Sequence, residues 1–334
     1  MKQRIAYYDV MKGILICLVI LHHIPYETIS VSKIPNDTFH WLGTHGGWYA
    51  CFFMPAFFMI TGLCSNFDKP FGKFFLQNLR TILLPGLVFD LLFYTTPRML
   101  ASGEYVAELI DFGLRFKSLG GYYWFLVSLF LAKIFYWGLH KLHISWHRWA
   151  LLGIGCLLGF VIKHYNLIYN HWSICQTLDL TLFLAIGQWL KSATIDRERL
   201  SRYCLWIFIG AIAVCYATGL KIPHVTAAYR INDWWQLPVH VLLATLGSLA
   251  LLNICQRIGS NRVLEYLGQG SLVIYMMHSF VIKFLLNHFG YWLTDASIVA
   301  SILMFVLMFV IVTALSAGFA WLFQQKYLRV LLGK

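Results

Sequence analysis

Charged residues are scarce in this chain. Only 12% of its 334 residues are Asp, Glu, Lys or Arg, while 59% are hydrophobic. A soluble domain carries about 25% charged residues, so this deficit excludes an ordinary soluble domain. Apolar runs long enough to cross a bilayer instead recur from one end of the chain to the other, separated by short polar loops. The sequence therefore predicts an all-α polytopic membrane protein that resides in the lipid bilayer.

Several other features are missing. The eight cysteines form no CxxC pair, and most lie inside apolar runs, so we expect neither a disulfide framework nor a cysteine zinc site. His140, His143 and His147 have no carboxylate or thiol pattern beside them, and we expect no metal there. No Lys/Arg tract with interleaved aromatic residues is present, which argues against nucleic acid as a partner. Since no linker or fixed-period repeat divides the chain, we expect a single integral-membrane domain over residues 1–334.

About ten transmembrane helices are expected. The apolar runs cover residues 9–27, 46–64, 75–95, 122–139, 149–165, 176–190, 203–219, 237–254, 271–289 and 297–323. With the N-terminus placed in the cytoplasm, fifteen Lys and Arg residues fall on the inner side and six on the outer side. Cytoplasmic loops of membrane proteins are enriched in these residues, so both termini are predicted to be cytoplasmic. The first run lacks a small-residue cleavage site, and we expect it to be retained rather than removed as a signal peptide.

The first apolar run carries three polar residues on one face. Lys12 and His23 are separated by about three helical turns, a rise of about 16 Å, and Asp9 precedes Lys12 by one turn. An ionisable group at bilayer depth costs roughly 2.5–3.5 kcal/mol on insertion scales, so it needs a partner or a function. An aligned set indicates a face that lines a pore, although Lys12 could also extend to the inner headgroups.

Two further regions place charge near or inside an apolar run. Lys73 and Arg80 stand at the cytoplasmic start of the run that contains Pro85, where a guanidinium could hold a phosphate bidentately. Lys73 could equally be an ordinary flanking cation. Asp179 lies near the outer end of its run and could orient an imidazole, or could pair with a lysine such as Lys163.

Aromatic and imidazole groups mark two more positions. Tyr275 and His278 are about one turn apart on one helical face, where His278 could bind substrate or be a hydrogen-bonded packing residue. Trp124 lies at the outer mouth of its run, where an indole could stack on a sugar ring or simply anchor the helix at the interface.

Five segments together resemble the membrane-bound acyltransferase family 3, and within it the fucose 4-O-acetylase-like members. "KGILICLVILHH" matches the family's first helix, with Lys12 and His23 at the basic position and at the essential histidine. "CFFMPAFFMITG", "LRTILLPG", "WSICQTLDLTLFLAIGQWL" and "LGQGSLVIYMMH" match later segments in the same order. The chain departs from the pattern at four positions: His22 stands where a glycine is usual, Phe53 replaces a histidine, Gln77 a basic residue and Gly86 a tyrosine.

The resemblance implies an O-acetyltransferase in the inner (plasma) membrane of a bacterium. The expected reaction moves an acetyl group from cytoplasmic acetyl-CoA to a hydroxyl of a cell-surface or lipid-linked glycan. Lys12, Arg80 and Lys73 would bind the donor and His23 would be the general base, oriented by Asp179 or Asp9. Trp124, Tyr275 and His278 would contact the acceptor.

A second class of function fits the same composition, namely a transporter or flippase of lipid-linked sugars. Transporters often consist of two similar halves with broken helices at matching positions. The polar residues of this chain cluster unevenly instead, which favours the enzyme. The sequence leaves open the acceptor sugar, the route through an acyl-enzyme, and the oligomeric state, a homo-oligomer included.

Overall fold

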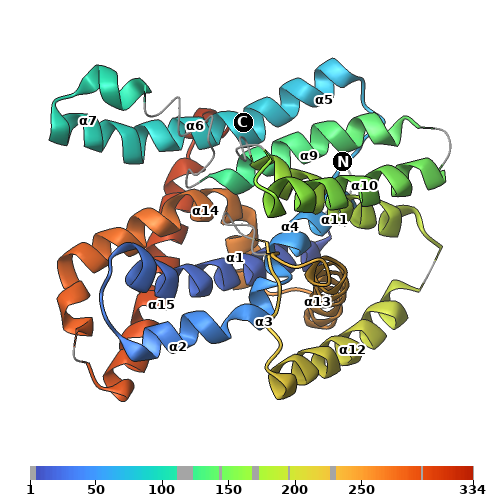
Figure 1. The fold of residues 1–334 in the computed structure, drawn as a ribbon. Helices are drawn as coiled ribbons and strands as arrows, with labels where there is room; N and C mark the ends of the chain where they lie inside the picture. Colours follow the sequence, from blue (N-terminus) through green and yellow to red (C-terminus); the bar gives the residue numbers. More distant parts are fainter. Residues whose placement is uncertain are drawn as a thin grey trace. The chain divides into compact units, whose positions relative to one another are not determined.

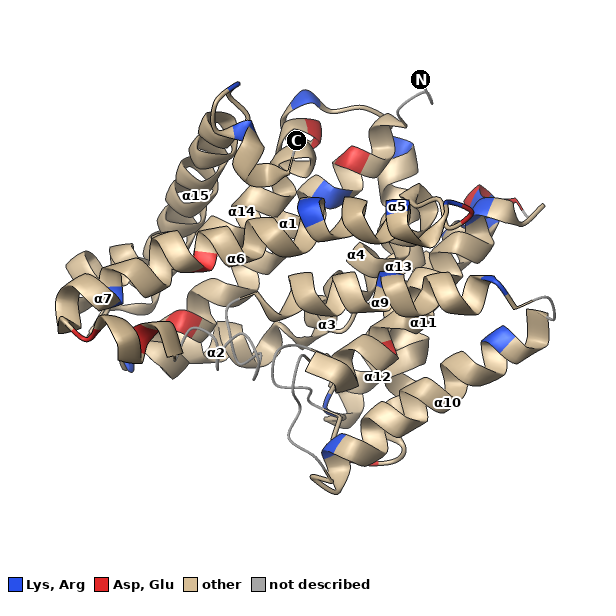
Figure 2. Ribbon diagram, turned by 90° about the horizontal axis from the view of Figure 1, so that it is seen from above, with Lys and Arg blue, Asp and Glu red and all other residues tan. Residues whose placement is uncertain are grey.

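The computed structural model describes residues 5–110, 123–142, 145–167, 173–194, 196–225, 231–294 and 296–333. Every regular element in these ranges is a helix (Figure 1). This confirms the predicted all-α class. The long helices are drawn without acidic or basic residues over most of their length (Figure 2), as a bilayer requires.

Eight helical runs in the described ranges are long and apolar enough to cross a membrane. They cover Ala6–Val31, Asp37–Cys64, Phe71–Ser102, Ser145–His164, Arg197–Thr218, Gln236–Ile258, Arg262–Leu293 and Ile298–Phe323. The other two predicted spans are also helical: α9 (Trp124–His140) is apolar but shorter, and α11 (Ile174–Ser192) contains several polar side chains. All ten predicted spans thus coincide with helices, while the cytoplasmic placement of the termini stays a prediction.

The chain forms two compact units that are interleaved in sequence. Unit 1 comprises Met1–Phe53, Glu198–Ile222 and Leu246–Gln325, and unit 2 comprises Met54–Arg197, Pro223–Thr245 and Lys326–Lys334. Helix α13 (Gln236–Ile258) contributes its first part to unit 2 and its second part to unit 1.

Unit 1 is built around α1 (Ala6–Tyr26), which packs along α14 (Arg262–Phe289) and also contacts α15 (Ile298–Phe323). Two glycines let the backbones of α1 and α14 touch. A Cβ added at Gly13 would lie 2.1 Å from the Leu264 carbonyl oxygen, and one at Gly268 would lie 1.9 Å from that of Asp9. Small residues at such a crossing are the usual means of bringing membrane helices together, because apolar lipid provides no hydrophobic force between them.

The remaining helical elements of unit 1 come from three separate parts of the chain. The π-helical turn η1 (Glu27–Val31) extends α1, and α2 (Asp37–His45) and α3 (Gly47–Ala50) come next. Helix α12 (Arg197–Thr218) belongs to this unit from Glu198 onwards, and the short η5 (Gly290–Leu293) follows α14.

Unit 2 contains α4 (Phe53–Cys64) from Met54 onwards, α9, α10 (Ser145–His164) and α11. Helices α4 and α11 meet through glycines in the same way as α1 and α14. A Cβ at Gly62 would lie 2.1 Å from the Leu184 carbonyl oxygen, and one at Gly187 would lie 2.0 Å from that of Met59.

The run Phe71–Ser102 in unit 2 is helical but irregular. It passes through α5 (Phe71–Asn78), η2 (Leu79–Leu83), α6 (Leu84–Asp90), η3 (Leu91–Thr95) and α7 (Thr96–Ser102), of which η2 and η3 are π-helical. Pro85 and Pro97 each follow a π-helical turn. Proline has no N–H to donate to the preceding turn, and its ring crowds the carbonyl four residues back. The wider π-helical turn therefore occurs just before each proline, where the sequence requires it. The short η6 (Arg329–Leu332) also belongs to this unit.

Candidate functional site

The two histidines singled out on α1 and α14 are in contact. The rings of His23 and His278 lie 4.8 Å apart between centroids and meet edge to face at 82°. The Nδ1 of His278 lies 2.6 Å from the carbonyl oxygen of Tyr275, which can only accept, so Nδ1 carries the proton. The hydroxyl of Ser279 then donates to Nε2 at 3.3 Å. His278 is therefore fixed in orientation by its own helix.

His23 is held differently. Its Nδ1 is buried and makes no hydrogen bond to any residue that the structure describes. The side chain as a whole is only partly buried. Since buried polar atoms are nearly always paired, a buried, unpaired ring nitrogen marks a place where a ligand group can bind.

An ion pair lies one turn beyond His23. Glu27 begins η1 four residues after His23, on the same side of the helical run. Its carboxylate lies 3.8 Å from the Lys283 ammonium, and the Glu27 and Lys283 side chains are 4% and 22% exposed. Sequence reasoning assigned no role to either residue. The sequence contains a signal for this pair. Glu27 is four residues, or about one helical turn, after His23, and both Glu27 and Lys283 fall within apolar runs.

Tyr275 belongs to the same group of side chains. Its ring lies 5.7 Å from that of His278, and it is 5% exposed. His22, in contrast, points its ring at Tyr49 and Phe53, with centroid distances of 6.2 and 5.4 Å. That only His23 of this pair belongs to the polar face stays a prediction.

The N-terminal part of α1 holds a second pair. The Lys12 ammonium lies 3.2 Å from the Asp9 carboxylate. Helix α1 is continuous from Ala6 to Tyr26, so Asp9 lies about 21 Å from His23 along the axis. The expectation that Asp9 could orient His23 is therefore wrong, since a carboxylate must be in hydrogen-bonding distance to do so.

Asp179 has a histidine partner that the sequence did not reveal. In unit 2, its carboxylate accepts a hydrogen bond from the Nε2 of His240 at 3.0 Å, and both side chains are fully buried. The imidazole that Asp179 orients is thus that of His240, on α13. Nothing in the local sequence around His240 indicated this, because the two residues belong to helices far apart in the chain.

Arg80 and Lys73 are exposed and lie on the same helical run of unit 2. Gln77, which stands between them, accepts a hydrogen bond from the Lys69 ammonium at 2.7 Å. A lysine therefore lies beside the position where the family pattern has a basic residue.

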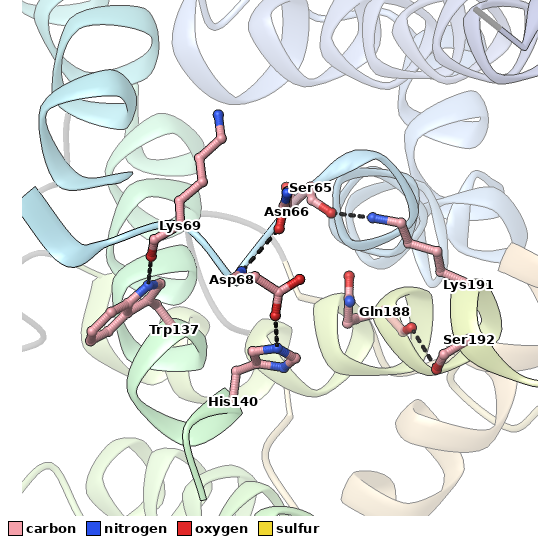
Figure 3. A network of polar contacts seen from close by, with 9 residues as sticks. All are labelled: Ser65, Asn66, Asp68, Lys69, Trp137, His140, Gln188, Lys191 and Ser192. Atoms are coloured by element: carbon pink, nitrogen blue, oxygen red, sulfur yellow. Dashed lines mark hydrogen bonds and ion pairs between the residues drawn. The ribbon is translucent and has the colours of Figure 1, made fainter. Parts of the chain in front are cut away.

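The loop that carries Lys69 is held by its neighbours (Figure 3). The Trp137 indole donates to the Lys69 carbonyl at 2.9 Å, His140 donates to Asp68 at 3.1 Å, and the Lys191 ammonium donates to the Ser65 carbonyl. The bond from His140 lowers the pKa of Asp68 below its usual value, which favours the ionised carboxylate. The helical run that carries Lys73 and Arg80 thus begins at a loop that hydrogen bonds hold in place.

Of two other positions that the sequence singled out, the structure describes one. Trp124 begins α9 and is 5% exposed, so its ring is buried within unit 2. His143 lies outside the described residues. Among the residues that the structure does describe, no group of three or more His, Cys, Asp and Glu side chains is arranged to hold a metal ion.

One membrane helix of this protein carries a histidine with an unpaired ring nitrogen. Another helical run carries exposed cations near its end. This combination is suited to group transfer at the membrane. The model of an acyltransferase domain matches residues 5–322, nearly the whole chain. The chain belongs to this acyltransferase family, family 3, and it is a membrane acyltransferase.

One similarity points to another class of membrane protein. A Na(+)/H(+) antiporter NhaA 2 of Pseudomonas syringae pv. syringae (strain B728a) is 30% identical over 144 residues, which cover 40% of this chain and 33% of the antiporter. The chain thus spans about a third of that relative's length. No solved structure matches the chain significantly.

Proposed function

We propose that this protein transfers an acetyl group from acetyl-CoA to a hydroxyl of a cell-surface or lipid-linked glycan, with His23 as the general base. The observation that supports this assignment most directly is the buried, unpaired Nδ1 of His23 beside the fixed ring of His278. A neutral imidazole with a free lone pair is the group that such a reaction needs.

The proposed step is direct. A ring nitrogen of His23 removes the proton of the acceptor hydroxyl as its oxygen attacks the thioester carbonyl. The carbon–sulfur bond then breaks, and the coenzyme A thiolate takes the proton from the imidazolium. The products are the acetyl ester and free coenzyme A, and the imidazole returns to its neutral form. His278 would keep the His23 ring in position through the edge-to-face contact.

The donor is a polyanion, so basic side chains are proposed to bind its phosphates. Arg80 and Lys73 are exposed on one helical run, Lys69 is bonded to Gln77 beside them, and Lys12 lies at the start of α1. Arginine can hold a phosphate with two parallel hydrogen bonds, whereas lysine acts as a point charge.

Acceptor binding is assigned to Tyr275 and Trp124, and His278 is assigned the positioning of His23. Tyr275 and His278 lie in the same cluster as His23, which supports a role for Tyr275 beside the reacting hydroxyl. The location proposed for the protein is the inner membrane of a bacterium, where cytoplasmic acetyl-CoA and an outward-facing glycan can be reached from opposite sides.

Transfer of radiolabel from acetyl-CoA to a panel of glycan acceptors tests this function in the purified protein. His23→Ala should abolish transfer, whereas His288→Ala, at an exposed histidine of α14 whose Nδ1 is bonded to the Phe284 carbonyl, should not. Arg80→Ala should raise the KM for acetyl-CoA. Transfer that survives the loss of His23 would refute the general-base assignment, and an unchanged KM would remove Arg80 from the donor site.

A transporter remains the second candidate. The similarity to part of an antiporter and the fully buried Asp179–His240 pair both favour it, since ionisable groups inside membrane helices often bind transported ions. Family membership favours the enzyme. Ion or proton flux in proteoliposomes, without any binding of acetyl-CoA, would favour the transporter over the enzyme.

A further inference from the structure

Unit 1 contains a pocket of about 450 Å³ beside the C-terminal part of α1. It is lined mainly by aromatic side chains from α2, α3, α12 and α15, namely Trp41, His45, Trp48, Tyr49, Tyr216 and Phe305. Leu21 of α1 also reaches it. The volume falls in the range of about 300–1,000 Å³ that small-molecule sites occupy.

None of the described residues that line the pocket is Asp, Glu, Lys or Arg, so these residues offer no counter-charge to an ionic ligand. Its aromatic rings are only partly covered: Trp41 is 57% exposed, Trp48 43% and Tyr216 46%. Exposed indole and phenol rings in a concave site offer flat apolar faces. These features fit a neutral ligand with a flat, weakly polar face.

The pocket also has polar atoms in defined orientations. The Tyr216 hydroxyl donates to the His45 carbonyl at 2.7 Å. The Nδ1 of His45 lies 2.9 Å from the Trp41 carbonyl oxygen, so Nδ1 is the donor and Nε2 is left as an acceptor. The His45 ring also stacks on Trp41 at 4.5 Å between centroids. Hydroxyls of a ligand can therefore donate to Nε2 of His45 and to the phenol oxygen of Tyr216.

The pocket is near His23 but on another face of α1. Leu21 and His23 are two residues apart, which places their side chains about 200° apart around the helix. His22 stands between these directions, and its ring contacts Tyr49 of the pocket at 6.2 Å. A ring bound in the pocket would thus lie near His23 without being in contact with it.

We propose that this pocket is a subsite for one pyranose ring of a neutral oligosaccharide acceptor, a ring other than the one that is acylated. A pyranose has an apolar C–H face that stacks on indole and phenol rings, and hydroxyls at its edge that match His45 and Tyr216. An alkyl chain would use the apolar faces but leave those polar atoms without partners, at a cost. The inference rests on the proposed function, because only a glycan acceptor gives the subsite its purpose.

Binding is measured separately from transfer, on the full chain in lipid nanodiscs. The probes are one-ring and three-ring methyl glycosides of glucose, N-acetylglucosamine and mannose, with farnesol as an alkyl-chain probe. Tryptophan fluorescence and isothermal titration report binding to the wild type, Trp41→Ala, Trp41→Phe and the matched control Trp206→Ala, which alters an indole 67% exposed on α12 outside the pocket.

At least one three-ring glycoside should bind the wild type and His23→Ala equally. Trp41→Ala should weaken this binding about tenfold, Trp41→Phe should weaken it less, and Trp206→Ala should leave it unchanged. Failure of every glycoside to bind, equal binding by Trp41→Ala, or a Trp41-dependent preference for farnesol would overturn the subsite. Glycoside binding without acetyl transfer would refute the proposed function alone, and transfer with an acceptor KM insensitive to Trp41→Ala would refute the subsite alone.

Discussion

The imidazole of His23 meets the edge of the His278 ring at a centroid distance of 4.8 Å. The two residues are on α1 and α14, whose backbones touch at Gly13 and Gly268. Because the two backbones approach closely, side chains on the facing sides of α1 and α14 can meet. Two rings that are far apart in the sequence are therefore in contact. Three predictions concern unit 1, in which this packing lies, and a fourth concerns a polar contact of unit 2.

Replacing His278 should lower turnover more than donor binding. His278→Ala removes the ring that fixes His23, while the group that accepts the proton is still present. A general base contributes about 10²–10⁴-fold, so loss of a residue that only positions it should cost less, about 10–100-fold in kcat. The KM for acetyl-CoA should change little. Steady-state kinetics with varied donor measure both values.

His278→Asn is the matched variant, since its side-chain amide nitrogen takes the place of Nδ1 and can still donate to the Tyr275 carbonyl. It should recover part of the lost kcat. An equal loss in the Ala and Asn variants, or a loss confined to KM, would contradict the positioning role.

Breaking the Glu27–Lys283 pair should destabilise unit 1. The two groups lie 3.8 Å apart and are 4% and 22% exposed, so removal of one leaves the other poorly compensated. Glu27→Gln and Lys283→Met should each lower the temperature at which half of the monodisperse protein is lost. The double variant should lose less than the sum of the two, as expected for groups that interact by about 0.5–3 kcal/mol. Additive losses would show that the two charges do not interact.

The crossing of α1 and α14 should not tolerate a methyl group. A Cβ at Gly268 would lie 1.9 Å from the Asp9 carbonyl oxygen, so the helices must separate to admit it. Gly268→Ala should therefore lower thermal stability and reduce acetyl transfer together. Overpacked sites cost about 1–3 kcal/mol.

Gly318→Ala on α15 is the control for this prediction, because a Cβ there meets nothing within 4 Å. It should be neutral or slightly stabilising, since alanine is favoured over glycine in a helix. Similar stability of the two variants would mean that the crossing is looser than described.

The Asp68–His140 contact should give a small, pH-dependent contribution to stability. Because the pKa of Asp68 is lowered in the folded state, its contribution is present above about pH 4, the usual aspartate value, and is lost as pH falls through the lowered pKa. Asp68→Asn should thus be slightly less stable than wild type at neutral pH, and the difference should vanish in acid. In a His140→Ala background, the same substitution should have a smaller pH-dependent effect, because only the weaker influence of Lys141 and Lys191 on the pKa of Asp68 is left. The side chain of Asp68 is largely exposed, so solvent screens the effect.

The sequence by itself determined the class of this protein. Scarce charge and repeated apolar runs predicted a polytopic helical membrane protein, and each expected span coincides with a helix. The order of its motifs predicted the family, which the match over residues 5–322 confirms. These features are local, because hydropathy and motif spacing depend on residues that are close together in the chain.

Tertiary structure decided which polar groups meet. It paired Asp179 with His240, excluded Asp9 as a partner of His23, and brought Glu27 to Lys283. It also gathered Trp41, Tyr216 and Phe305 around one pocket. Helical periodicity tells which face of a helix a residue occupies, but not which other helix covers that face. That choice depends on where glycines allow two backbones to touch and on which buried charges find a partner, and both are properties of the packed molecule.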